Sequence, residues 1–240
     1  MRAWLDDCDS NHKDCQTSHY PYPTRLIDVG TLGNPKLRLV VPRTDFKIHG
    51  QGNEGIRENR WITLSHAWGD LSNENVFWTS RQNIDFLREG IPFEQLPATF
   101  QDAVTTTRAL NVRYLWIDAI CIVYGQSGDF NEEAKRMEGV FSGAHCVIAA
   151  SRATSQADGF LKPRTQGEYL TFQRGNQKPF YMCESINNFY QDVLEGPLNQ
   201  RGWVLQERAL ARRTIFFTDT QTYFECGNGV RCETLVKMHQ

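Results

Sequence analysis

The stretch Tyr114-Leu115-Trp116-Ile117-Asp118-Ala119-Ile120-Cys121 is an apolar run that one carboxylate interrupts and one thiol ends. An apolar run of this length between polar segments is typical of a parallel strand that helices cover on both faces. Asp118 then falls at the carboxyl end of the strand, where the loops of an open α/β sheet part and leave a crevice for ligands. The stretch therefore predicts a central strand with a candidate site at its end.

Segments on either side of this run alternate between strand and helix patterns. Further strands are predicted at Trp61–Ser65, His145–Ala150, Thr214–Thr218 and Thr222–Cys226. Helices are predicted at 97–110, from Asp129 to about Phe141 with Asp129 as the N-cap, and at 201–210. The alternation predicts an α/β fold, a mainly parallel sheet with flanking helices and extra antiparallel strands.

The remaining segments give weaker signals. Leu26–Val29 and Leu37–Val41 are short apolar pieces among Pro, Gly and Asn, which predicts edge strands or a hairpin. Residues 50–59 are expected to form a mobile loop. Tyr169–Phe172 and Phe180–Cys183 are possible antiparallel strands in a region, 151–196, whose role the sequence does not indicate.

Composition argues against several classes of partner. The 26 basic and 28 acidic residues are nearly balanced, so we expect no binding to nucleic acid or to an anionic membrane. The acidic amino terminus is unlike a signal peptide, and no run approaches the roughly 18 apolar residues of a membrane span. Seven cysteines, an odd number, disfavour a secreted disulfide framework. We expect a cytoplasmic protein with reduced thiols.

The amino-terminal segment contains Cys8, His12, Cys15 and His19 in the spacing C-x3-H-x2-C-x3-H. Zinc prefers thiolate and imidazole ligands in a tetrahedron, so these residue types are suitable. The spacing matches no standard zinc finger, however. We therefore expect free thiols, no metal, and a helix that docks on the domain.

The strand Trp61–Ser65 continues into His66-Ala67-Trp68-Gly69-Asp70, a polar, glycine-containing turn typical of a site loop at a sheet edge. Ser65 and His66 are neighbours in extended chain, so their side chains should point to opposite faces. That disfavours a serine nucleophile with His66 as its base. A hydrogen-bonded structural role for His66 is the more common alternative.

Three segments carry a family resemblance: Leu64-Ser65-His66-Ala67-Trp68-Gly69, Leu115-Trp116-Ile117-Asp118-Ala119-Ile120-Cys121-Ile122 and Gly202-Trp203-Val204-Leu205-Gln206-Glu207-Arg208. In order and approximate spacing they resemble the fungal heterokaryon-incompatibility (HET) domain. Together with Leu96–Ala103 and Pro23–Asp28, the resemblance covers most of residues 23–226. It implies an amino-terminal segment at 1–22, a HET domain at 23–240 and a role in the cell death of fungal non-self recognition. Tyr124 stands where the family usually has glutamine.

The HET family is in turn remotely similar to TIR domains, whose NAD-cleaving members carry a glutamate in a Trp-x-x-x-Glu pattern. Trp203 and Glu207 match that pattern. The resemblance thus implies a TIR-like core with Glu207 as the catalytic carboxylate and Asp118 as a second catalytic residue. The residues expected to bind substrate come from the same motifs: Ser65, His66, Trp68, Gly69, Cys121, Arg201, Trp203 and Gln206.

Three functions remain open on this evidence. The first is an NAD glycohydrolase with NAD as substrate and no cofactor, active when it self-associates or when a partner activates it. The second is a non-catalytic signalling module in which Trp68, Trp116 and Trp203 are core aromatics and Asp118 caps a turn. The third uses Cys121 as a nucleophile assisted by His66 and Asp118. It is the weakest, because Cys121 lies in an apolar run where cysteines are usually buried packing.

Overall fold

The structure is a computed structural model that describes residues 1–15, 20–31, 33–46, 60–72, 76–164, 169–173, 175, 180–183, 188–233 and 237–238. The loop predicted at 50–59 and His19 lie outside these residues. No helix in the described ranges is long and apolar enough to cross a membrane.

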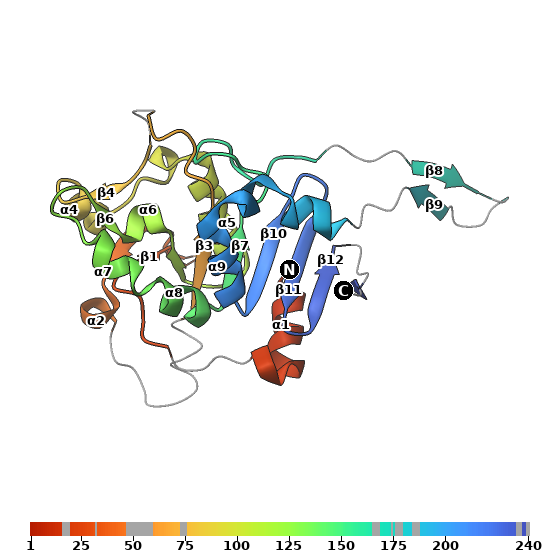
Figure 1. Cartoon of the computed structure of the whole chain (residues 1–240), viewed down its shortest axis with the longest axis horizontal. Helices are drawn as coiled ribbons and strands as arrows, with labels where there is room; N and C mark the ends of the chain where they lie inside the picture. Colours follow the sequence, from red (N-terminus) through yellow and green to blue (C-terminus); the bar gives the residue numbers. More distant parts are fainter. Residues whose placement is uncertain are drawn as a thin grey trace.

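One large sheet organises the described part of the chain, with the strand order β13-β12-β11-β10-β7-β3-β5-β1-β2 (Figure 1). Its strands are β1 (Leu26–Asp28), β2 (Arg38–Val40), β3 (Trp61–Ser65), β5 (Tyr114–Trp116), β7 (Cys146–Ala149), β10 (Arg213–Phe217), β11 (Thr222–Cys226), β12 (Gly229–Cys232) and β13 (Lys237–Met238). Strands β10, β7, β3 and β5 run parallel, and the outer strands pair antiparallel. The predicted α/β class is confirmed. Of the two predicted alternatives for residues 26–41, the structure shows the hairpin, because β1 pairs antiparallel with β2, and of these two strands only β2 lies at the edge of the described sheet.

The helices are α1 (Arg2–Asn11), α2 (Pro42–Asp45), α4 (Ile84–Glu89), α5 (Ala98–Ala109), α6 (Asp118–Cys121), α7 (Phe130–Ala134), α8 (Met137–Gly143) and α9 (Gly202–Leu210). Short helical turns are η1 (Lys13–Cys15), η2 (Phe93–Gln95), η3 (Tyr190–Leu194) and η4 (Pro197–Gln200). Two small sheets pair β4 (Thr79–Ser80) with β6 (Val123–Tyr124), and β8 (Tyr169–Phe172) with β9 (Phe180–Cys183). The antiparallel pair predicted at 169–183 is confirmed and lies apart from the large sheet (Figure 1).

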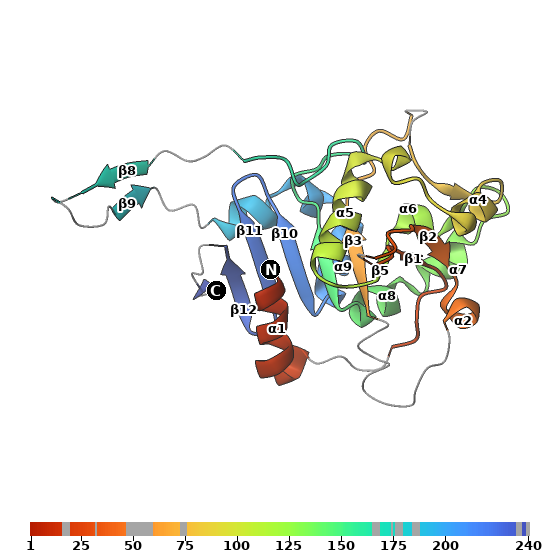
Figure 2. The same cartoon turned by 180° about the vertical axis from the view of Figure 1, so that it is seen from behind.

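Helices cover the parallel strands on both faces. Helices α8 and α9 lie in front of the sheet in Figure 1, and α5 lies on the opposite face in Figure 2. Helix α5 buries Phe100, Ala103, Val104 and Thr107, which recur at the spacing expected of one helix face. Because both faces are covered, every residue of β3 and β7 is buried, which explains their continuous apolar sequence.

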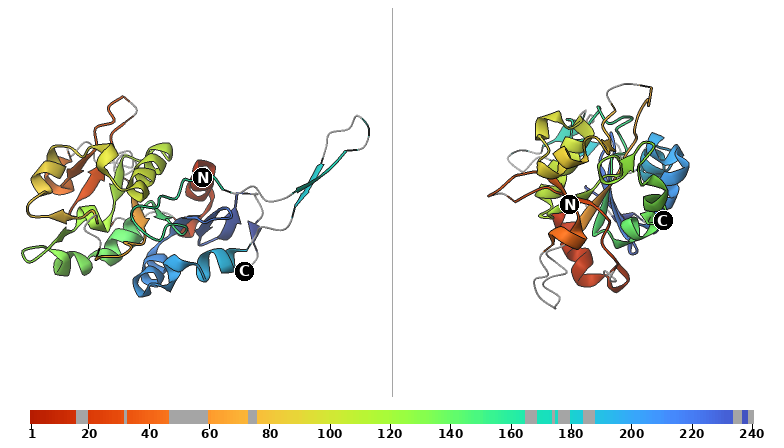
Figure 3. Two further views of the ribbon diagram at one scale, coloured as in Figure 1. Left: turned by 90° about the horizontal axis from the view of Figure 1, so that it is seen from above. Right: turned by 90° about the vertical axis from the view of Figure 1, so that its left-hand side faces the viewer.

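The antiparallel half of the sheet is also covered on both faces. Along β10, Ile215 and Phe217 belong to the main core, whereas Phe216 faces a second cluster that contains Phe189 and Tyr223. This alternation follows from the two-residue period of a strand. Helix α1 packs on the main-core side, where Trp4 stacks on Phe224 with a ring-centroid distance of 5.9 Å. The predicted docking helix is thus confirmed, and Figure 3 shows α1 beside the last strands.

The strand predicted at 114–121 is shorter than expected. Strand β5 ends at Trp116, and the α6 turn begins at Asp118, so the prediction is wrong beyond Trp116. The chain turns here because the Cys121 N–H donates to Ile117 O at 2.7 Å, and the Asp118 carboxylate accepts the Ala119 N–H at 2.7 Å. An apolar turn buried in the core has the same composition as a buried strand, which is why periodicity does not separate them.

The helix predicted from Asp129 to Phe141 is two helices, α7 and α8. Asp129 precedes α7 but makes no side-chain capping bond. Its carboxylate instead accepts the Val123 N–H at 2.9 Å and pairs with Arg25. The capping pattern therefore predicted the start of the helix correctly. The Asp129 carboxylate does not cap the helix because it binds the buried guanidinium of Arg25.

Candidate functional site

A cleft of about 1170 Å³ opens at the carboxyl ends of the parallel strands. The chain passes from β3 to β5 on one side and then to β7 on the other side of β3, so the strand order reverses at β3. Open α/β sheets bind ligands at such a switch point, outside the carboxyl ends of the strands. The loop after β3, the start of α6, and helix α9 all contribute walls to the cleft. Asp118 and the loop after Ser65 share this edge, as predicted.

Helix α9 divides its residues among three environments. Val204 is buried against the sheet, and Arg208 is half-buried on the same side. Leu205 points outward and is 67% exposed. The third side faces the cleft and carries Trp203, Gln206, Glu207 and Leu210. Trp203 and Glu207 therefore share one face, as expected of residues four apart in a helix.

Glu207 is held at the base of the cleft by Ser65. The Ser65 hydroxyl donates to Glu207 Oε2 at 2.5 Å, which joins α9 to the end of β3. The pKa of Glu207 is raised to about 7, with burial as the largest cause. The charge of Asp118 also raises it, while the bond from Ser65 and the charge of Arg201 lower it. A carboxyl group with a pKa near neutrality in a cleft is a candidate catalytic group.

The arginines near Glu207 in sequence have other partners. Arg208 forms a two-pronged pair with Glu225, at 2.8 and 2.6 Å. Arg213 pairs with Asp9 at 2.7 Å, and Arg201 donates to the carbonyl of His66 at 2.6 Å. These contacts therefore do not make Glu207 the structural ion-pair partner of Arg201, Arg208 or Arg213.

Asp118 both lines the cleft and stabilises a turn. Its Oδ2 accepts the indole N–H of Trp68 at 2.8 Å, while Oδ1 accepts the Ala119 N–H at 2.7 Å. His66 Nδ1 lies 3.7 Å from the same Oδ1. Asp118 was interpreted either as a site residue or as a residue that stabilises the following turn. Both interpretations apply, because one carboxylate oxygen holds Trp68 at the cleft and the other accepts the Ala119 N–H of the turn.

His66 lies behind this carboxylate with its side chain 1% exposed. Its ring packs edge-on against Phe100 of α5, with the centroids 5.0 Å apart, whereas Ser65 reaches Glu207 of α9. The two neighbours thus face opposite sides of the sheet, as predicted. Burial lowers the pKa of His66, which favours the neutral ring, and Nε2 is buried without a hydrogen-bond partner among the described residues. A buried, neutral ring packed between Phe100 and Asp118 suits a positioning role.

Aromatic side chains form a second part of the cleft lining. Tyr124 is edge-on to Trp68 with centroids 5.1 Å apart, and it also contacts Trp78 and Phe130 at 5.9 and 5.7 Å. Trp78 and Phe130 are each 47% exposed. Sequence reasoning missed these two residues, because Trp78 directly precedes the short strand β4, Phe130 begins α7, and neither belongs to a segment that carries the family resemblance. The sequence did carry one signal for this aromatic group. Tyr124 stands where the family usually has glutamine, and its ring contacts both Trp78 and Phe130.

Gly69 and Cys121 were both predicted to bind substrate, but only Gly69 lines the cleft. Gly69 lines the cleft with φ +83°, and a Cβ there would lie 2.7 Å from Ser155 Cβ, so only glycine fits without a shift. Cys121 is not among the residues that line the cleft. It is 1% exposed, and burial raises the pKa of its thiol to about 12, which opposes a nucleophilic role.

The predicted residues that line the cleft are therefore His66, Trp68, Gly69, Asp118, Arg201, Trp203, Gln206 and Glu207. Ser65 lies behind them, bonded to Glu207. In the described part of the chain, the group of Cys, His, Asp or Glu side chains with metal-ligand spacing lies elsewhere, at α1. What the cleft itself offers is a half-buried carboxyl group, a second carboxylate, an arginine and a set of aromatic faces.

The sequence was then compared with known proteins. The model of the family described as Heterokaryon incompatibility protein (HET) matches residues 61–207, more than half of the chain. Comparisons with curated proteins and with solved structures each returned no significant match. The matched segment begins with β3 and ends at Glu207, so it contains both chain segments that the Ser65–Glu207 bond joins. The chain therefore belongs to the heterokaryon incompatibility (HET) family, which implies involvement in heterokaryon incompatibility and its cell death.

Proposed function

We propose that this HET domain is an NAD glycohydrolase, with Glu207 as its catalytic carboxylate. The observation that carries the proposal is that Glu207 lines a large cleft that also exposes aromatic faces. The pKa of its carboxyl group is raised to about 7 there. Nicotinamide and adenine are flat rings that stack on such faces. Arg201, at the same cleft, supplies positive charge for the pyrophosphate.

The chemistry needs few groups. The bond between C1′ of the ribose and the nicotinamide nitrogen breaks, and its electron pair neutralises the cationic pyridinium, so the leaving group requires no general acid. Positive charge develops on the ribose, where the ionised Glu207 stabilises it. Water then adds to C1′, which yields ADP-ribose, nicotinamide and one proton. Removal of water around Glu207 strengthens this electrostatic effect over that in bulk solvent.

The other polar residues hold this carboxylate in place. Ser65 orients Oε2 of Glu207 through its 2.5 Å bond. Asp118 fixes the Trp68 ring through the bond from the indole N–H, so that an aromatic face keeps its position in the cleft. We assign Asp118 this positioning role, in addition to its negative charge near the ribose.

The test is release of nicotinamide from NAD by the purified chain at high concentration. Glu207→Gln nearly preserves shape and removes the charge, so cleavage should fall by at least about a hundredfold with no loss of melting temperature. Glu195→Gln is the matched control, because Glu195 is exposed and does not line the cleft. It should cleave NAD as the wild type does. A wild-type rate of NAD cleavage in Glu207→Gln would contradict the assignment of Glu207 as the catalytic carboxylate.

The second candidate function is a non-catalytic signalling module of the same cell-death response. The observation that favours it is the structural use of two motif residues, since Trp116 is 1% exposed and the Asp118 carboxylate accepts the Ala119 N–H in the α6 turn. Trp203 is 70% exposed, so it is not the core aromatic that this candidate expects. This candidate predicts no nicotinamide release at any protein concentration, with cell death retained by Glu207→Gln in cells that express it. The two readouts together separate the candidates.

A further inference from the structure

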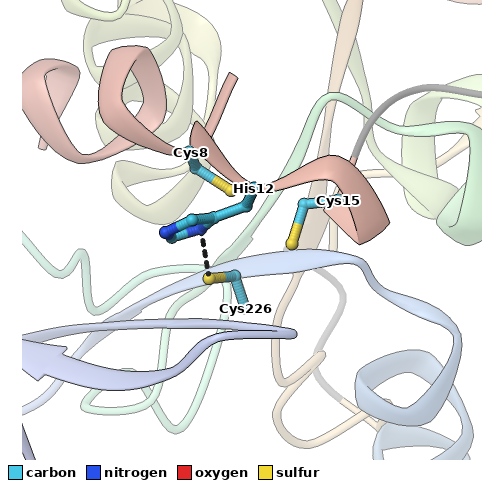
Figure 4. Close-up of side chains that lie close together, drawn as sticks. All are labelled: Cys8, His12, Cys15 and Cys226. Atoms are coloured by element: carbon cyan, nitrogen blue, oxygen red, sulfur yellow. Dashed lines mark hydrogen bonds between the residues drawn. The ribbon is translucent and has the colours of Figure 1, made fainter. Parts of the chain in front are cut away.

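Four side chains from the two ends of the sequence converge beside the antiparallel strands. Cys8 lies on α1, Cys15 ends η1, His12 lies between these two elements, and Cys226 ends β11. One ligand atom from each of the four lies within 4.8 Å of all the others (Figure 4). Cys226 Sγ lies 3.4 Å from His12 Nδ1.

Regular secondary structure produces this convergence. Cys8 lies in the last turns of α1, His12 follows the helix in an extended conformation, and Cys15 ends η1, so the change of direction at His12 turns the three side chains toward one another (Figure 4). Trp4, one turn before Cys8, stacks on Phe224 of β11. Cys226 is two residues beyond Phe224, so it points to the same face of the sheet. The docking of α1 thus brings three potential ligands to the fourth.

We propose that Cys8, His12, Cys15 and Cys226 bind a structural zinc ion. Three thiolates and one imidazole form a closed tetrahedral ligand set of a kind known for structural zinc. With Zn–S bonds of about 2.3 Å, the sulfur atoms of a tetrahedron are about 3.8 Å apart, so the cluster needs to contract by only about 1 Å. The sulfur-rich set opposes magnesium and calcium, which prefer oxygen ligands.

The surroundings suit a metal ion with bound thiolates. His12 Nε2 lies 2.8 Å from the side-chain amide of Asn228, which orients the ring so that Nδ1 faces Cys226. The backbone N–H of Asn228 points to Cys226 Sγ at 3.5 Å. Zinc with three thiolates carries a net charge of −1, and the guanidinium of Arg213 lies beside Cys8 and donates to Cys15 O at 2.8 Å.

The backbone also leaves room at this point. The turn between β11 and β12 has glycine at position 227, where a Cβ would lie 3.4 Å from Cys15 Sγ. Free thiols were expected because Cys8, His12, Cys15 and His19 have irregular spacing. The fourth ligand of the proposed site is instead Cys226, which is more than 200 residues away in the sequence. Apolar packing accounts for buried thiols, but not for an imidazole among them.

Elemental analysis of the full 240-residue chain, expressed with zinc and purified in reductant without chelator, tests the proposal. We expect about one zinc per chain, and loss of most of it in Cys226→Ser. Cys232→Ser is the matched control, because Cys232 is a buried cysteine on the next strand and outside the cluster. It should keep its zinc. His12→Cys should also keep zinc, whereas His12→Ala should lose it.

Cobalt substitution of the wild-type chain keeps the proposal testable if Cys226→Ser does not fold. Cobalt bound by three thiolates should give intense tetrahedral d–d bands and sulfur-to-metal charge-transfer absorption. Zinc-free, folded wild-type protein that also fails to bind cobalt would overturn the proposal. So would a disulfide between two of the three cysteines in protein purified under reducing conditions, or full zinc content in Cys226→Ser.

Discussion

Single residues at the cleft combine structural and chemical roles. Asp118 uses one oxygen for the Ala119 N–H and the other for the Trp68 indole, and Ser65 ends a strand while it orients Glu207. The sequence indicated both residues, because each follows or ends an apolar strand. The partner of Ser65 is 142 positions away, so strand spacing does not predict it. The resemblance around Trp203 and Glu207 was the only signal for this pair.

The titration of Glu207 predicts a pH dependence for NAD cleavage. Its pKa is raised to about 7, so the reactive carboxylate is present above that pH and lost below it. Cleavage should fall about tenfold per pH unit well below neutrality and level off above it. The bond from Ser65 lowers the pKa of Glu207, so Ser65→Ala should move the midpoint of the profile to higher pH. A midpoint that is unchanged in Ser65→Ala would contradict this coupling.

The same shift has a consequence for stability. The pKa of Glu207 in the folded chain lies above its ordinary value of 4.5, so the folded state holds the proton more tightly. This contribution is fully present below pH 4.5 and is lost as the pH rises through about 7. Melting curves should therefore show that Glu207→Gln gains stability relative to the wild type between pH 5 and pH 8.

Among the helices and strands, sequence periodicity predicted the type of an element better than it predicted where the element ends. The strands β3 and β7 and helix α5 were predicted within one or two residues, because their burial patterns are continuous or strictly helical. The run at 114–121 was misassigned beyond Trp116, because a buried turn and a buried strand are equally apolar. The aromatic contact of Tyr124 with Trp78 depends on the pairing of β4 with β6, which short strands of two residues do not reveal.

Helix α1 is expected to be an integral part of the folded domain. Trp4 is 8% exposed and stacks on Phe224, so it fills the core side of the antiparallel strands. Trp4→Ala should lower the free energy of unfolding by about 3–5 kcal/mol, measured by urea denaturation. Leu170→Ala, at a side chain 63% exposed on β8, should change it by less than about 0.5 kcal/mol. A near-neutral Trp4→Ala would show that α1 docks without contributing to stability.

In the whole molecule, one continuous sheet connects the cleft with the proposed zinc site. The parallel strands and their crossovers build the cleft, and the antiparallel strands with α1 carry the proposed zinc site. Strand β10 links them, because it pairs with β7 on one side and with β11 on the other. Helix α9 precedes this strand, so the helix that carries Glu207 is anchored to the element shared by both halves.

The outward face of α9 leads to a prediction about assembly. Leu205 is 67% exposed on the helix that carries Glu207, and it does not line the cleft. We expect self-association that covers this face to hold α9 in place, so that NAD cleavage per chain rises with protein concentration. Leu205→Lys should then reduce the activity of concentrated protein to that of dilute protein, since a charge resists burial. Leu170→Lys, at the exposed β8 position, is the matched control and should leave the concentration dependence intact. Light scattering would report the accompanying change in mass, and wild-type activity per chain that is constant with dilution would contradict activation by assembly.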